Sequence, residues 1–102
     1  GVGEQRFFET MRNAASPQQI LDDARKYGYK PGEQRAFVMA KVLEKNKVIV
    51  VGSKDSDMIR QAKMIPAATM DEAFAIIQQH LGPQGDVLIV PHALLTLPIV
   101  QP

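Results

Sequence analysis

Hydrophobic positions in the first 46 residues recur at helical spacing and predict three helices. The first is expected over residues 1–15, where apolar side chains return every three or four positions. The second is expected over residues 17–28, because Ser16 is a preferred N-cap residue and Gln19 stands three positions later, as in a capping box. The third, over residues 33–45, is apolar almost all round, which indicates a helix buried between other elements.

From residue 47 onward the period changes, and strands are expected to alternate with helices. Residues 48–51 and 87–90 are short continuous apolar runs, the pattern of parallel strands covered on both faces. Helices are expected over 55–63 and 69–81, the latter with one apolar stripe. Residues 64–66 predict a short strand whose proline favours the edge of a sheet.

This order of elements predicts an α/β fold with a small parallel sheet of about three strands, flanked by about five helices in a three-layer, Rossmann-like arrangement. We expect a single domain over residues 1–102, with a helical part at 1–46 and a strand–helix repeat at 47–102. The tail, residues 92–102, is expected to be an extended segment packed on the body of the domain. The two strongly apolar strands, 48–51 and 87–90, should have neighbouring strands at both edges and other elements packed on both faces, which a sheet of about three strands does not supply. We therefore expect a fragment of a larger protein, truncated at its N-terminal end. Pairing of its exposed apolar surface into a homodimer is left open.

Composition and charge narrow the class of protein. Of the 102 residues, 45% are hydrophobic and 23% charged, as in globular domains. Twelve basic against 11 acidic residues leave a net charge of +1, which argues against nucleic-acid and acidic-membrane partners. The absence of cysteine excludes disulfides, thiolate metal sites and a cysteine nucleophile, and favours a reducing, cytoplasmic location. No apolar run approaches the roughly 18 residues that span a bilayer.

A few residues could carry chemistry. The glycines of Gly1-Val2-Gly3 either cradle an anion or form a tight turn from a strand into a helix. His80 stands near the C-terminal end of a helix, where a cap or exposed role suits it. His92 follows a parallel strand directly, at the edge where α/β sheets bind ligands, although a structural role is the simpler interpretation.

The remaining candidates have structural explanations. Asp22-Asp23 and the pair Asp55 and Asp57 lie in the first turns of helices, where helix capping accounts for them. Four methionines fit apolar faces better than a soft-metal site; they are Met39, Met58, Met64 and Met70. Since no catalytic triad, metal-binding helix motif or phosphate loop is present, the chain is expected to carry no self-sufficient active site.

Five segments stand out along the chain. They are Gly-Val-Gly-Glu at 1–4, Ala-Ser-Pro-Gln-Gln-Ile-Leu at 15–21, Ala-Lys-Val-Leu-Glu-Lys at 40–45, Met-Ile-Pro-Ala-Ala-Thr-Met-Asp-Glu-Ala at 64–73, and Val-Leu-Ile-Val-Pro-His at 87–92 with Thr96-Leu97-Pro98. In this order they resemble the C-terminal region of the nickel-dependent lactate racemase family. The fourth segment and the Thr-Leu-Pro tail are the most specific.

The resemblance implies a two-lobed enzyme that inverts the hydroxyl-bearing carbon of lactate or a related 2-hydroxy acid. It implies a nickel-pincer nucleotide, tethered to a lysine, that accepts a hydride while a histidine takes the hydroxyl proton. The tethering lysine, the nickel histidine and both acid–base histidines belong to the N-terminal lobe. By resemblance, therefore, this chain holds no catalytic residue and no metal ligand.

One substrate contact of the family is implied within this chain, an aromatic residue at the start of the third helix. Counting back from Ala40-Lys41-Val42-Leu43 places it at Gln34, and a glutamine there departs from the family's tryptophan-like wall, which questions lactate as the substrate. The family's glycines after the last strand are replaced by Ala93 and Leu94.

Two hypotheses follow. The first is a C-terminal lobe, inactive alone, that forms one wall of the interlobe cleft, with the N-terminal lobe and a 2-hydroxy acid as partners. The alternative is a non-catalytic α/β regulatory or interaction module that binds a partner or a small anion at the carboxyl edge of its sheet.

Overall fold

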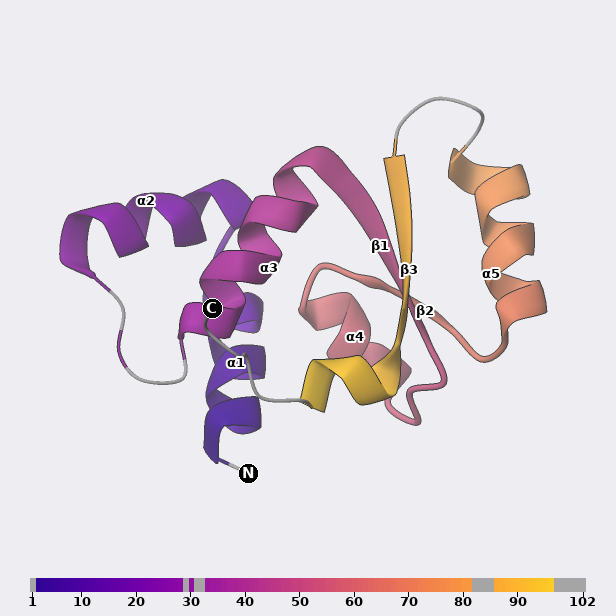
Figure 1. Ribbon diagram of the computed structural model, residues 1–102, viewed down its shortest axis with the longest axis horizontal. Coiled ribbons are helices and arrows are strands. Elements are labelled where there is room, and N and C mark those ends of the chain that lie inside the picture. The colour runs from indigo at the N-terminus through magenta and orange to yellow at the C-terminus, as the bar shows by residue number, and fades with distance from the viewer. Residues whose placement is uncertain (1, 29, 31–32, 82–85, 97–102) are drawn as a thin grey trace.

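The computed structural model describes residues 2–28, 30, 33–81 and 86–96 and confirms the α/β architecture (Figure 1). A parallel sheet lies between helices α1 to α4 on one face and α5 on the other. The elements are α1 (Val2–Asn13), α2 (Pro17–Tyr27), α3 (Gln34–Lys45), β1 (Asn46–Val51), α4 (Ser56–Gln61), β2 (Ile65–Ala67), α5 (Met70–Ile76), the π-helical turn η1 (Ile77–Leu81), β3 (Asp86–Pro91) and the 3-10 helix η2 (His92–Thr96).

The sheet has the strand order β2-β1-β3, and both pairings are parallel. Strand β1 is central, and its residues Val48, Ile49 and Val50 are buried, as the continuous apolar run predicts. The short strand β2 lies at an edge, where its proline does not interrupt a ladder on both sides, so that prediction is also confirmed. The register pairs Val51 with Ala67 on one side and with Pro91 on the other.

Alternation along β1 divides the core into two clusters. Val48 and Val50 point toward the larger cluster, which joins α1, α2, α3 and α4 and includes Phe7, Met11 and Ile59. On the opposite face Ile49 packs with Ala67 and Ala73 in a much smaller cluster under α5. One face of the sheet is therefore well covered and the other only thinly.

Local hydrogen bonds set the helix starts that the sequence predicts. The Ser16 hydroxyl accepts the Gln19 N–H at 3.2 Å, and the Gln19 side chain accepts the Ala15 N–H at 2.6 Å. This is the expected capping box with one difference: the Gln19 side chain accepts the N–H of Ala15 instead of the N–H of the N-cap residue, Ser16. Thr69 caps α5 in the same way, accepting the Glu72 N–H at 3.1 Å.

The turn between α4 and β2 is tied back to the first helix by Lys63. This residue adopts a φ of +71°, which side chains other than glycine rarely take. Its Nζ donates a hydrogen bond to the carbonyl oxygen of Met11, near the end of α1. Partial burial there lowers the pKa of Lys63. The contact joins segments 52 residues apart in the sequence and holds α1 against the turn.

The expectation that residues 87–90 form a strand covered on both faces is wrong. Strand β3 lies at the edge of the sheet, and Leu88 is 43% exposed. The third helix is likewise not buried all round, because the Val38 side chain is 45% exposed. Both elements are apolar enough for interior positions, but in this chain no element packs on their outer sides among the described residues.

Two further predictions need correction. In the apolar stripe of residues 69–81, Ala73 is buried but Met70 and Phe74 are 46% and 52% exposed, and the helix changes to a π-helical turn at Ile77. The tail does not continue as an extended segment after β3. Residues 92–96 form η2, because Leu95 turns back into the larger cluster and is 4% exposed; residues 97–102 lie outside the described part.

Candidate functional site

The carboxyl ends of the three strands meet along one edge of the sheet. Because Val51 is in register with Ala67 and Pro91, the residues that follow, Gly52, Ala68 and His92, come next to this edge. The edge also continues the ladder for one step, since the Gly52 N–H donates to the Ala67 carbonyl at 2.9 Å. In open parallel sheets this is the edge at which ligands bind.

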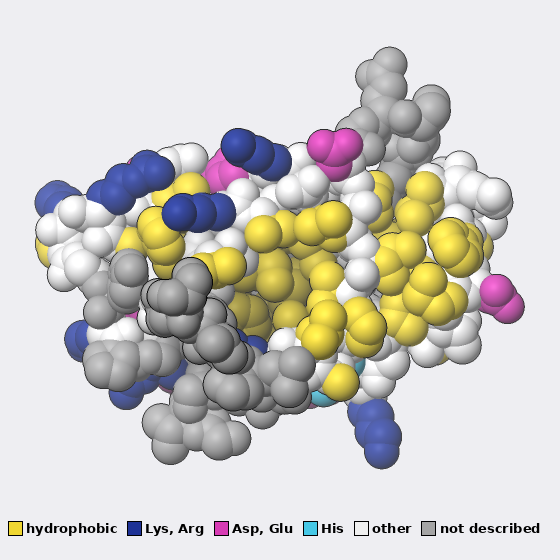
Figure 2. Space-filling view, viewed as in Figure 1, with side chains coloured by type: hydrophobic (Ala, Val, Ile, Leu, Met, Phe, Trp, Pro, Cys, Tyr) yellow, Lys and Arg dark blue, Asp and Glu magenta, His cyan; other side chains and the backbone are white. Residues whose placement is uncertain are grey.

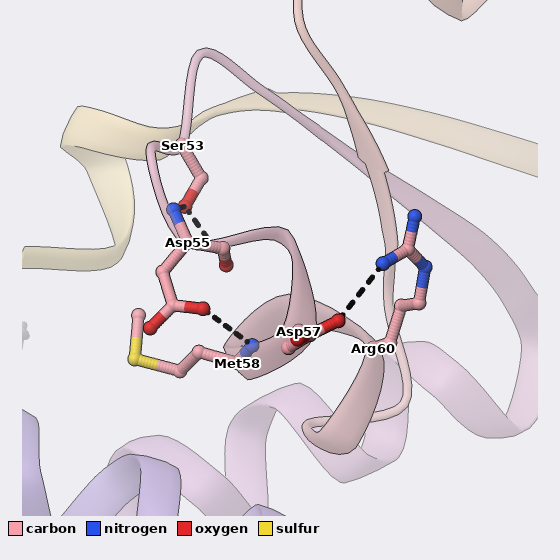
Figure 3. A network of polar contacts seen from close by, with 5 residues as sticks. All are labelled: Ser53, Asp55, Asp57, Met58 and Arg60. Atoms are coloured by element: carbon pink, nitrogen blue, oxygen red, sulfur yellow. Dashed lines mark hydrogen bonds and ion pairs between the residues drawn. The ribbon is translucent and has the colours of Figure 1, made fainter.

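The loop after β1 is held by its own polar contacts (Figure 3). The Asp55 N–H donates to the Ser53 hydroxyl at 3.2 Å, and the Asp55 carboxylate accepts the Met58 N–H at 3.0 Å. Asp57 pairs with Arg60 at 3.1 Å, on the exposed surface of the same helix. The Asp55 side chain therefore caps α4, as the sequence predicts.

His92 contributes an unpartnered nitrogen at this edge. It is the first residue of η2, and its Nε2 atom is buried without a hydrogen-bond partner. A buried polar atom normally has a partner. Ser53 and Asp55 use their side chains within their own loop.

A cleft lies between the first two helices and the start of α3, apart from the carboxyl edge of the sheet. This α1–α2 cleft has a volume of about 540 Å³. Its rim carries the basic side chains of Arg6 and Lys30 and the acidic side chains of Glu9, Asp23 and Glu33. Glu33 already accepts the backbone N–H of Lys30 at 2.7 Å. Because both signs of charge are present, the cleft does not select an anion.

Gln34, the substrate contact that the resemblance implies, is the first residue of α3 and is half-buried. Its neighbours Glu33 and Phe37 line the α1–α2 cleft, but Gln34 does not. No sequence signal indicates this cleft, because its walls come from three helices that tertiary packing brings together. Nothing in the contacts of Gln34 tests its role toward a substrate.

Of the remaining candidates, Asp23 lines the α1–α2 cleft and Asp22 does not. Asp22 accepts a hydrogen bond from Gln18 at 2.9 Å on the exposed side of α2, as expected of a helix-stabilising residue. His80 falls in η1. Of the glycines at the start, Gly1 lies outside the described residues and Gly3 is within α1.

The described residues do not offer a donor set for a resident nickel ion. Within them, no three His, Cys, Asp or Glu side chains gather closely enough to bind a metal. His92 stands at the sheet edge without a second ligand, and the chain has no cysteine. The nickel group that the resemblance implies does not fit the described residues, and no chemical step through it is assigned to them.

No helix in the described ranges is both long and apolar enough to cross a bilayer.

Comparison with known proteins gives one match. A family model described as "Lactate racemase C-terminal domain" matches residues 1–97 of the 102. Neither the curated proteins nor the solved structures contain a match.

Proposed function

Since this chain belongs to the lactate racemase C-terminal domain family, we propose that it is the C-terminal lobe of an enzyme that inverts a 2-hydroxy acid. In this proposal the lobe forms one wall of an interlobe cleft and is inactive alone. The family match over residues 1–97 carries the proposal. The parallel sheet with helices on both faces supports it, because such sheets place ligands at the carboxyl edge.

In the proposed reaction, this chain binds the substrate and helps to enclose it. A nickel-pincer nucleotide, when bound in the full-length enzyme, would supply the hydride acceptor. The carboxyl edge with His92 and the start of α3 with Gln34 supply polar surface for the substrate side of the cleft. Closing such a wall over the substrate would exclude water from the reacting carbon.

The test compares the intact parent polypeptide with the 102-residue chain. We expect the cofactor-loaded parent to interconvert the enantiomers of a 2-hydroxy acid, and the chain alone to match the uncatalysed rate, measured by chiral chromatography. Turnover by the isolated chain would show that catalytic groups lie within it. A loaded parent that racemises no 2-hydroxy acid would contradict the proposed reaction.

Gln34 is proposed to contact the substituent of the 2-hydroxy acid. Replacing it by tryptophan (Gln34→Trp) in the intact enzyme should favour small apolar substrates. The indole ring would leave less space for the substrate at this wall and would exclude water from it. We expect kcat/KM for lactate to rise about tenfold relative to a larger or more polar 2-hydroxy acid. The ratio of the two kcat/KM values measures the effect.

The matched control is Gln18→Trp, since Gln18 is exposed on α2 and bonds only within its own helix in the contacts found. This variant should leave the substrate ratio unchanged. If Gln34→Trp also leaves the ratio unchanged, Gln34 does not line the substrate site.

The alternative, a non-catalytic module that binds a small anion or a partner, stays a prediction. The α1–α2 cleft does not favour an anion, because three acidic side chains accompany its two basic ones.

A further inference from the structure

Strand β3 has the side chains of an interior strand but the position of an edge strand. Its residues 87–90 are all apolar, on both faces, and among the described residues no strand pairs with its other long side. Natural edge strands are usually protected by charges, prolines, bulges or shortness. In β3 a charge and a proline stand only at the two ends, Asp86 and Pro91, and residues 87–90 carry neither. Figure 2, viewed onto this side of the sheet, shows hydrophobic side chains gathered over β3 between α3 and α5. The surface includes Leu88, which is 43% exposed.

The two complete crossovers of the sheet fix the handedness of its connections. From β1 the chain passes through α4, on the face of the larger cluster, to β2 on one side. From β2 it passes through α5, on the opposite face, to β3 on the other side. In the second crossover the chain moves across the sheet in the opposite direction, and its helix lies on the opposite face. Because both are reversed, the two crossovers have the same handedness. Figure 1 shows it to be the right-handed one, which about 98% of such connections adopt.

The first three helices lie on the same face as α4. Residues of α1, α2 and α3 all belong to the larger cluster with Val48 and Val50. Figure 1 shows α1 starting at the end of the molecule where β3 finishes, and α3 finishing where β1 starts. These helices therefore have the arrangement of a crossover that leads from a parallel strand into β1.

A right-handed crossover on this face determines where such a strand must lie. The connection from β1 through α4 on the same face moves to the β2 side, so a connection into β1 must come from the β3 side. The place beside β1 on that side is already taken by β3. The next place is the free edge of β3.

We propose that the segment directly preceding residue 1 in the parent polypeptide forms a fourth parallel strand on the free edge of β3, giving the order new strand-β3-β1-β2. This rests on the proposed function only in requiring that the chain is the C-terminal part of a longer protein. The strand should be apolar on both faces, because it continues a sheet whose β3 presents Leu88 on one face and Ile89 on the other. Its carboxyl end would come beside His92, at the candidate edge.

Hydrogen exchange measures the occupancy of this edge directly. In the 102-residue chain, the β3 amides that point away from β1 should exchange almost freely. In the intact parent, we expect the exchange of these amides within residues 86–90 to be slowed at least a hundredfold, because they would donate to the added strand. Equal exchange of these β3 amides in both proteins would overturn the proposal.

Self-association of the chain is a separate outcome. We expect sedimentation to show a monomer at the concentration used for exchange. If the isolated chain is instead a dimer with β3 protected, a second copy is the occupant and the proposal is wrong. Exchange requires neither cofactor nor turnover. A parent that racemises without protecting β3 therefore refutes only the added strand, and a parent that protects β3 without racemising refutes only the reaction.

A variant pair gives a second measurement. Leu88→Lys should lower the melting temperature of the intact parent by several degrees, because it places a charge on the face of the sheet beside the apolar side chains of the added strand. It should change the melting temperature of the 102-residue chain little. Met70→Lys is the control, since Met70 has a similar exposure of 46% but begins α5, after β2. Equal effects of Leu88→Lys in parent and chain would contradict the proposal.

Discussion

Replacing Phe7 by alanine is expected to lower the free energy of unfolding of the chain by about 3–5 kcal/mol. Phe7 is 1% exposed and packs edge-to-face against Phe8, with ring centroids 5.0 Å apart. The Arg35 guanidinium lies 5.2 Å from the Phe7 ring centroid, so the ring also links α1 to α3. Truncation would leave a cavity between α1 and α3, the first and last helices of the helical part. Urea unfolding followed by circular dichroism measures the loss.

The chain offers a matched control in Phe74, which is 52% exposed on α5. Phe74→Ala should cost less than about 1 kcal/mol, because most of the ring is already in water. Phe7→Leu, expected to cost about 1 kcal/mol, keeps the comparison measurable if the alanine variant is unfolded. Equal losses for Phe7→Ala and Phe74→Ala would contradict the core described above.

The helix starts could be predicted from the sequence because their causes are local. Ser16, Asp55 and Thr69 each accept a backbone N–H three residues later, and each bond depends only on the neighbouring sequence. The central strand could be predicted for a similar reason, since a short β-branched run such as residues 48–51 has few other uses. Local signals and tertiary structure agree at these places.

The burial of β3 and α3 could not be predicted correctly, because an apolar run does not identify what covers it. Residues 87–90 and 48–51 have similar patterns, but the first run has one strand neighbour and the second has two. Val38 and Leu88 are exposed for the same physical reason, a missing neighbour on the outer side. The added strand proposed above would explain the pattern of β3.

The candidate site was predictable only in part. His92 could be placed at the carboxyl edge, because the strand before it was recognisable, but its unpartnered Nε2 depends on the packing of η2. The α1–α2 cleft could not be predicted, since Arg6, Asp23 and Glu33 are distant in sequence and carry no shared motif. Gln34 came from the family resemblance alone, and its role stays a prediction.

Leu95 is expected to hold η2, and with it His92, against the sheet. Leu95→Ala should lower the free energy of unfolding by about 2–5 kcal/mol, because its side chain is 4% exposed in the larger cluster. Its neighbour Leu94 is 52% exposed, so Leu94→Ala should cost well under about 1 kcal/mol. Both substitutions are leucine to alanine and remove the same atoms, so a difference between their denaturant midpoints reports only the difference in burial. Because Leu95 anchors the 3-10 helix that begins at His92, its loss should also release the imidazole, seen as a shift of the His92 ring signals in NMR spectra that Leu94→Ala does not produce. Similar costs for the two variants would mean that residues 92–96 do not pack against the core, and the His92 edge would then lose its structural basis.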